Sequence, residues 1–251
     1  MVIPSVSGTT KESVALIARC KQLGAKVLSL VGHADTPVAR EATVACVNYA
    51  ADDTSCENLY IQSLLIALSV MHHRGEDLSY AQTLAQLRLM PDLLLGVKDQ
   101  FAEMAASYAA RIEREPYHLI TAAGNCWPEA WYFGMCILEE MQWIKTRPVH
   151  AADFFHGPLE LVEKDVSLIL LKGEDAARPL VERVERFAAG VTSKVAVLDA
   201  AAFDLPGLSP TVRALISPIL LATVLERVSA HLEVRRDHPL TTRRYYRRMA
   251  Y

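Results

Sequence analysis

Residues 131–163, WYFGMCILEEMQWIKTRPVHAADFFHGPLELVE, hold the pattern around which the rest of the sequence is organised. Apolar residues recur at helical spacing through the first half of this stretch, and Glu140 lies on that predicted helix. A short extended segment follows, and His156 then comes directly before Gly157 and Pro158. A carboxylic acid and an imidazole in this order suggest proton-transfer chemistry, because both groups can serve as acid or base.

Short apolar segments alternate with helical patterns on both sides of this stretch. The predicted strands are 1–6, 26–31, 43–49, 118–122, 149–152, 166–171 and 194–198. The predicted helices are one that ends near Gly24, then 56–72, a long region over 80–115 that is broken near Pro91, and 127–143, 176–188 and 211–234. Apolar strands joined by helices predict the α/β class, with parallel sheets covered on both faces.

This alternation occurs twice and predicts two α/β domains. We expect a first domain over 1–78, a helical connector over 79–115, a second domain over 116–235 and a C-terminal tail over 236–251. The second half contains two strand–helix steps before its middle strand, whereas the first half contains none before a serine-rich turn. We therefore expect the first domain to be truncated at its N-terminus, by roughly 80 residues if each strand–helix unit takes ~30–40. A minimal variant without these elements is the alternative.

The composition argues against several classes of function. The chain has 251 residues and a net charge of −3, which gives no reason to expect nucleic acid or an anionic membrane as a partner. The one basic run is a set of arginines in the tail, which we interpret as solvated or interface-forming. No apolar run reaches the length of a membrane span. The five cysteines form no C-x-x-C pair, so we expect buried free thiols and a cytoplasmic protein.

The serine-rich turn lies between the first predicted strand and the first predicted helix. It contains Ser5, Ser7, Gly8 and Thr10. Hydroxyl groups and the unpaired N–H groups of a helix N-terminus together can hold a phosphate, and a glycine lets the backbone approach it. An ordinary capped helix is the alternative, because serine and threonine are common capping residues. No P-loop and no G-x-G-x-x-G motif is present, so a nucleotide is not favoured.

Glu140 is the candidate acid of the central stretch. In α-helical geometry its neighbours three and four positions away are all apolar, namely Cys136, Ile137, Trp143 and Ile144. An apolar environment favours the protonated form of a carboxylic acid, which suits a group that must both take and give a proton. A carboxylate at the rim of the core, or in a structural ion pair, is the alternative.

His156 is the candidate imidazole. Phe154 and Phe155 precede it and a Gly-Pro pair follows, so the local backbone is expected to hold the ring in place. A structural histidine is the alternative. The remaining histidines receive only that structural interpretation, and the sequence shows no metal-ligand constellation.

At these residues the chain resembles the sugar isomerase (SIS) superfamily of two-domain phosphosugar-binding proteins. The serine-rich turn is similar to the family phosphate motif S-x-S-G-x-T. The segment from Glu140 to Ile144, with His156 sixteen residues after Glu140, resembles the phosphosugar deglycases of that superfamily, whose pattern runs M-E-M-Q-W-I to F-F-H-G-P. Residues 238–245, HPLTTRRY, also match the C-terminus of those deglycases. Lys145 departs from the fructose-asparagine enzymes, which have histidine at this position.

The resemblance implies a fold, an activity and a set of site residues. It implies two SIS-type three-layer αβα domains and a homodimer without cofactor or metal. The implied reaction is deglycation of a 6-phosphorylated Amadori product to a hexose 6-phosphate and a free amine. The implied roles are phosphate binding by the serine-rich turn, C1 proton transfer by Glu140, and assistance in ring opening by His156 of the neighbouring subunit.

Three other functions stay open from the sequence. The first is a ketose/aldose phosphate isomerase of the kind found in glucosamine-6-phosphate synthase. That synthase uses a C-terminal lysine, and this sequence has no lysine after Lys194. The second is a non-catalytic phosphosugar sensor, which has no evident need for Glu140 and His156. The third is an inactive fragment.

Overall fold

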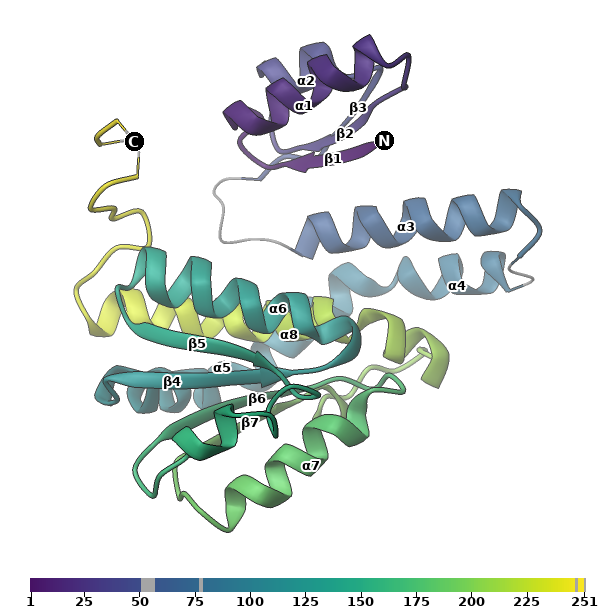
Figure 1. The fold of residues 1–251 in the computed structure, drawn as a ribbon. Helices are drawn as coiled ribbons and strands as arrows, with labels where there is room; N and C mark the ends of the chain where they lie inside the picture. The colour runs from purple at the N-terminus through teal and green to yellow at the C-terminus, as the bar shows by residue number, and fades with distance from the viewer. Residues whose placement is uncertain (51–56, 77–78, 247, 251) are drawn as a thin grey trace. The chain divides into compact units, whose positions relative to one another are not determined.

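The computed structural model describes residues 1–50, 57–76, 79–246 and 248–250 (Figure 1). The chain divides into two compact units, Met1–Leu78 (unit 1) and Ser79–Tyr251 (unit 2). Cys56, the predicted start of a helix, and Arg247 of the basic run lie outside the described residues.

Unit 1 contains a parallel three-stranded sheet. Its elements are β1 (Val2–Ser5), α1 (Lys11–Gln22), β2 (Leu28–Val31), α2 (Pro37–Glu41), β3 (Val44–Val47) and α3 (Glu57–His73). The strand order is β1-β2-β3, with Ser5 at the carboxyl end of β1 paired to Val31. Buried apolar side chains form its core: Ile3, Ile17, Cys20, Val27, Val31 and Val38.

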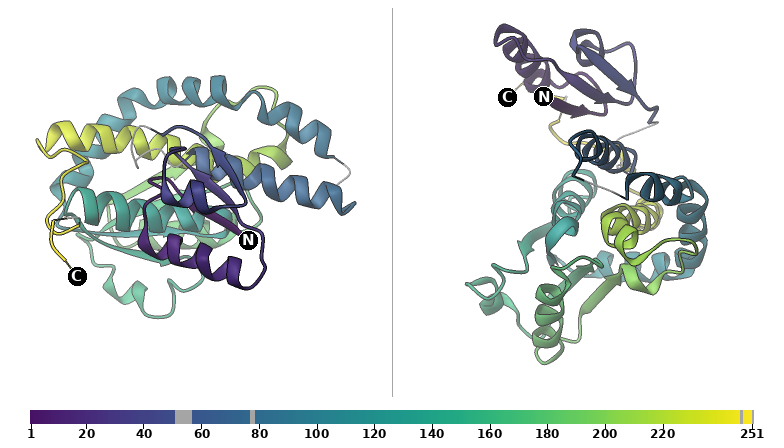
Figure 2. Two further views of the ribbon diagram at one scale, coloured as in Figure 1. Left: turned by 90° about the horizontal axis from the view of Figure 1, so that it is seen from above. Right: turned by 90° about the vertical axis from the view of Figure 1, so that its right-hand side faces the viewer.

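Unit 2 contains a parallel four-stranded sheet in the order β5-β4-β6-β7. Its elements are α4 (Tyr80–Leu87), α5 (Met90–Arg114), β4 (Tyr117–Ala122), α6 (Trp127–Tyr132), a π-helix (Phe133–Met141), β5 (Lys145–His150), a short 3₁₀-helix (Pro158–Leu161), β6 (Ser167–Lys172), α7 (Arg178–Ala189), β7 (Val195–Asp199) and α8 (Pro210–Arg235). Helix α7 covers one face of the sheet, and α6 and α8 lie on the other, with α5 against α8 (Figure 1, Figure 2). The predicted α/β class with parallel sheets is confirmed.

The region over 80–115 is broken near Pro91 as predicted, at Arg88 and Leu89, and Pro91 itself lies in the first turn of α5, where its missing N–H costs no bond. One strand differs clearly from the prediction. The strand predicted over 149–152 is Lys145–His150. This strand lies at the edge of the sheet, and its charged residues and Pro148 hide the strand pattern in the sequence.

Helix α8 is the central element of the unit 2 core. By length and composition it could cross a membrane, so the expectation that no apolar run is long enough is wrong. However, 72% of its most apolar window is buried inside the molecule. Its buried hydroxyls bond to the helix itself, as in Thr223 to the Ile219 carbonyl (3.0 Å) and Ser229 to the Leu225 carbonyl (2.8 Å). Such burial, with hydroxyl groups bonded within the helix, is typical of a helix in the core of a protein.

The described cysteines are all free. Cys20 and Cys126 are buried as expected, whereas Cys46 and Cys136 are only partly buried. Burial raises the pKa of the Cys126 thiol well above its ordinary range, with smaller contributions from the charges of Asp175 and Glu129. Cys126 is therefore a packing residue rather than a nucleophile.

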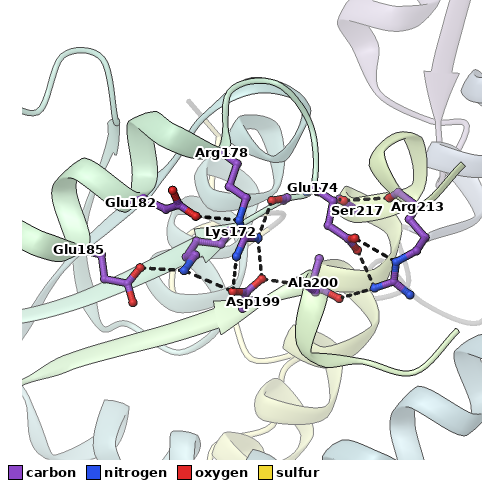
Figure 3. A network of polar contacts seen from close by, with 11 residues as sticks. Lys172, Glu174, Arg178, Glu182, Glu185, Asp199, Ala200, Arg213 and Ser217 are labelled. Atoms are coloured by element: carbon purple, nitrogen blue, oxygen red, sulfur yellow. Dashed lines mark hydrogen bonds and ion pairs between the residues drawn. The ribbon is translucent and has the colours of Figure 1, made fainter. Parts of the chain in front are cut away.

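A network of charged side chains joins the carboxyl ends of β6 and β7 to α7 and α8 (Figure 3). Arg178 donates two hydrogen bonds to the Asp199 carboxylate, at 2.8 and 2.6 Å. Lys172 lies between Asp199 (3.3 Å) and Glu185 (2.8 Å). Burial acts to raise the pKa of Asp199, but the hydrogen bonds from Arg178 and the Ala201 N–H and the charges of Arg178 and Lys172 outweigh it and lower that pKa. The network fixes the strand ends to the helices that cover them.

His118 is a second buried polar group of unit 2, on β4. Its Nε2 lies 3.1 Å from the Ile112 carbonyl of α5, and its Nδ1 lies 2.9 Å from the Ser167 hydroxyl of β6. Because a carbonyl can only accept, Nε2 carries the proton and Nδ1 accepts from the serine. Burial lowers the pKa of His118, while the bond to Ile112 and the charge of Glu115 oppose that shift. The neutral ring therefore links helix to sheet.

We expect the free energy of unfolding of unit 2 to fall as the pH drops below about 6.5, the ordinary pKa of histidine. Below that pH this histidine is protonated in the unfolded chain, whereas His118 stays neutral in the folded chain. A fall in pH therefore favours the unfolded state. His118→Gln should flatten this dependence, and His73→Gln, at an exposed histidine of α3, should not. Urea unfolding followed by the fluorescence of the three tryptophans, all in unit 2, measures it. An unchanged slope in His118→Gln would contradict the assignment.

Candidate functional site

The serine-rich turn of unit 1 begins where β1 ends and leads directly into α1. The Gly8 N–H donates to the Ser5 carbonyl at 3.0 Å and closes the turn. Gly8 has φ +62°, and a Cβ added there would come within 2.2 Å of the Thr36 hydroxyl oxygen. A glycine is thus required, both for the backbone conformation and for the close approach of the loop after β2.

The turn holds polar groups that the described residues leave unsatisfied. The Ser5 hydroxyl is buried and has no hydrogen-bond partner among the described residues. Thr10 occupies the N-cap of α1 but its side chain makes no capping bond, so it leaves the first-turn N–H groups uncapped. Ser7 accepts from the Thr9 N–H at 3.4 Å. This arrangement differs from an ordinary capped helix and is suited to an anion.

The turn that follows β6 in unit 2 has the same position between a strand and a helix but the opposite chemistry. It contains Glu174 and Asp175 in place of hydroxyls. Asp175 accepts from the Asn125 N–H (2.8 Å) and the Ala177 N–H (2.9 Å), and Glu174 pairs with Arg213 (2.7 Å). The Ala177 N–H of this turn is thus already bound to a carboxylate, and the Glu174 N–H donates to the Ser217 hydroxyl at 2.9 Å. A phosphate would also meet like charge there.

Glu140 lies near the end of the π-helix and is more exposed than the sequence predicts. The helix ends at Met141, so Trp143 and Ile144 are not its helical neighbours, although both line the same pocket as Glu140. The side chain of Glu140 is 39% exposed and forms an ion pair with Arg243 at 2.8 Å. Wide helical turns of this kind are rare and often occur at functional sites.

Glu140 and Arg243 line an open pocket of about 580 Å³. The residues that line it come from the end of the π-helix, the start of β5 and the tail: Glu139, Glu140, Trp143, Ile144, Lys145, Thr146, Arg243, Arg244, Tyr245 and Tyr246. The Arg243 side chain is only 11% exposed, so its charge is held in the pocket rather than in solvent. A carboxylate beside a fixed guanidinium has a defined orientation and is accessible to a ligand.

The tail is attached to unit 2 around Trp143. The rings of His238 and Trp143 form a T-shaped pair with 4.3 Å between centroids, and the Arg244 guanidinium lies 3.9 Å from the centroid of the Trp143 ring. The Gln142 amide also donates to the His238 carbonyl at 2.7 Å. Trp143 itself has φ +56°, a conformation that is costly outside glycine. Of the basic run, interpreted as solvated or interface-forming, Arg243 is largely shielded from solvent, whereas Arg244 is exposed and stacks on Trp143.

His156 lies at the tip of the loop after β5 and is exposed. Phe154 is fully buried, and Phe155 stacks against the Arg183 guanidinium of α7 at 4.0 Å. Gly157 has φ +124°, which only a glycine adopts easily. The two phenylalanines thus anchor the loop to unit 2, as the sequence predicts, while the imidazole faces solvent.

Glu140 and His156 are not brought together within one chain. Glu140 precedes the amino end of β5, and His156 follows its carboxyl end. The six residues of this strand span about 17 Å at ~3.3 Å per residue. His156 is also not among the described residues that line the Glu140 pocket.

No pattern in the sequence indicates a role for Arg243 or for the other tail residues that line the pocket. The only signal was the segment HPLTTRRY, which supported the family resemblance without indicating where it lies. No local pattern connects residue 243 to residue 140, so the ion pair could only be found from the tertiary structure.

Comparison with known proteins extends over both units. No family model matches the sequence. The chain is 30% identical to the fructosamine deglycase FrlB of Bacillus subtilis, over 100% of this chain and 77% of that protein. It is 26% identical to the fructoselysine 6-phosphate deglycase of Escherichia coli K12, over 95% of this chain and 68% of that protein. A Bacillus subtilis crystal structure described provisionally as a phosphosugar isomerase matches with a TM-score of 0.93 at 29% identity, over 100% of this chain and 76% of that one.

We expect Trp143→Ala to release the tail, because it removes the aromatic surface that His238 and Arg244 contact. Trypsin should then cleave after Arg243 and Arg244 roughly 3- to 10-fold faster, the range that a lost cation–π contact of ~1 kcal/mol gives. Trp131→Ala is the matched control, since Trp131 is exposed on α6. Equal cleavage rates in both variants, measured by mass spectrometry, would show that Trp143 does not hold the tail.

Proposed function

The chain belongs to the phosphosugar deglycase group of the sugar isomerase (SIS) superfamily, and on that premise we propose that it cleaves a 6-phosphorylated Amadori product to a hexose 6-phosphate and a free amine. The observation that carries this proposal is the likeness to a fructosamine deglycase along the whole chain. The pocket geometry supports it, because it holds an accessible carboxylate beside a fixed cation.

The proposed reaction begins with the open-chain ketoamine. Glu140 removes a proton from C1 while the C2 carbonyl oxygen takes a proton from solvent, and the electron pair moves to form a C1–C2 enaminol. Glu140 returns its proton at C2 and the nitrogen gives up its own proton, which leaves an imine between C1 and the nitrogen. Water adds to C1, the C–N bond breaks, and the products are the aldose 6-phosphate and the amine. One water is consumed and no electrons are exchanged with a cofactor.

Arg243 is a positioning residue in this scheme. Its Nε donates to Glu140 Oε1 at 2.8 Å, which fixes the direction of the carboxylate and leaves the other oxygen for the C1 proton. A charge-assisted hydrogen bond of this kind restricts the carboxylate more firmly than a neutral one.

His156 assists ring opening in the active site of the neighbouring subunit of a homodimer. Two observations support this arrangement. The imidazole is exposed on an anchored loop, and the length of β5 separates it from Glu140 of its own chain. An exchange of histidines across a two-fold axis would complete two identical sites.

The phosphate is held by the serine-rich turn of unit 1, through the hydroxyls of Ser5, Ser7 and Thr10 and the backbone at Gly8. The buried, unpartnered Ser5 hydroxyl supports this assignment. We further place 1–78 and 116–235 as the two SIS domains, with 79–115 as connector and 236–251 as tail. A cytoplasmic location fits the free cysteines and the metabolic role of the relatives.

We expect Glu140→Gln and His156→Gln each to lower release of hexose 6-phosphate by about 100-fold or more, the usual cost of losing an acid–base group. A coupled assay for hexose 6-phosphate measures this. Wild-type rates in either variant would contradict the assigned role.

Mixing the two variants tests the exchange between subunits. A mixed dimer has one site with both substitutions and one intact site. Random mixing makes half of the dimers mixed, so about a quarter of wild-type activity should return. If no activity returns while mixed dimers are detected by native mass spectrometry, His156 acts within its own chain or not at all.

We expect Ser5→Ala to weaken inhibition by the hexose 6-phosphate product roughly 10-fold, because it removes a hydrogen bond to a charged group. Ser29→Ala is the matched control, since the Ser29 hydroxyl on β2 is also buried without a partner among the described residues. An equal effect of both substitutions would place the phosphate elsewhere.

A further inference from the structure

We propose that Lys145 and Arg244 form a binding subsite for a carboxylate on the amine half of the substrate. The enzyme would then favour Amadori products of amino acids over those of uncharged amines. This inference rests on the proposed function, because it places the amine half of the substrate in the Glu140 pocket.

The charges of the pocket are not balanced. Its two carboxylates are Glu139 and Glu140, and its three cations are Lys145, Arg243 and Arg244. Glu140 is paired with Arg243. Glu139 accepts two hydrogen bonds from Thr146, from the N–H at 3.2 Å and from the hydroxyl at 2.7 Å.

The two remaining cations have no carboxylate of their own. Neither Lys145 nor Arg244 forms an ion pair with another residue in the part of the chain that the structure describes. Lys145 is the exposed first residue of β5. Arg244 is held over the Trp143 ring at 3.9 Å. A cation–π contact leaves the N–H groups at the edge of a guanidinium available to an anion.

The backbone of Lys145 and the guanidinium of Arg244 are each held by contacts within the chain. Lys145 is paired opposite Tyr117 in the sheet, which sets the direction in which its side chain leaves the strand. Trp143 positions Arg244 by stacking, and the tail before it is attached through His238. A subsite that is organised before the ligand arrives loses less entropy on binding.

The chemistry of the reaction brings the amine half to these cations. Glu140 acts at C1, and C1 carries the nitrogen. The substituent on that nitrogen must therefore lie in the pocket that Glu140 lines. If the substituent is an amino acid bound through its α-nitrogen, its carboxylate is only two bonds from the nitrogen. An anion so close to C1 would meet the unpaired charges of Lys145 and Arg244.

The test compares two substrates that differ only in this carboxylate: the fructosamine 6-phosphates of glycine and of glycinamide. Lys145→Met should raise KM for the glycine compound about 10-fold with little change in kcat, and should leave both constants for the glycinamide compound unchanged. Arg244→Met should act in the same direction. Lys164→Met, at an exposed lysine away from this pocket, is the matched control and should change neither substrate.

The possible outcomes separate this inference from the proposed function. If the wild type releases hexose 6-phosphate from both compounds and Lys145→Met affects both equally, the lysine serves the phosphate or the fold, and the subsite is wrong. An unchanged KM for the glycine compound in Lys145→Met overturns it as well. If the wild type cleaves neither compound, the proposed function fails and this inference fails with it.

Discussion

The pairing of β4 with β5 constrains the chemistry of unit 2 more than any other contact. The register runs without interruption from Tyr117 opposite Lys145 to Ala122 opposite His150, so β5 is a rigid spacer of fixed length. Glu140 is held at one end of that spacer and the loop of His156 at the other. This separation is the reason for proposing that the two groups act on one substrate from two copies of the chain.

The tail is part of the pocket rather than an appendage. Trp143 follows the helical segment in a strained conformation, and its ring contacts both His238 and Arg244. This attachment carries Arg243 to Glu140 across more than a hundred residues of sequence. The strain at Trp143 is thus coupled to the placement of the proposed catalytic carboxylate.

The two units show how similar turns take different chemical roles. In unit 1 the turn after β1 offers hydroxyls and uncapped N–H groups, with the Ser5 hydroxyl left unsatisfied among the described residues. In unit 2 the turn after β6 offers Asp175 and Glu174, whose carboxylates bind the chain itself. The second turn contributes to the polar network around Lys172 and Asp199 and so to the stability of unit 2, whereas the first turn is the one proposed to bind the phosphate (Figure 3).

The α/β class and most of the strands and helices could be predicted from the amino-acid sequence, and Glu140, His156 and the serine-rich turn could be proposed as site residues, because apolar periodicity and short motifs are local. The sequence pattern misplaced β5, since an edge strand with charges and Pro148 lacks an apolar pattern. It also misjudged the environment of Glu140, because helical spacing assumed an α-helix that continues through Trp143. The pairing of Arg243 with Glu140 and the separation of Glu140 from His156 by β5 become evident in the folded chain alone. Both depend on contacts or distances between distant parts of the chain, which no local pattern records.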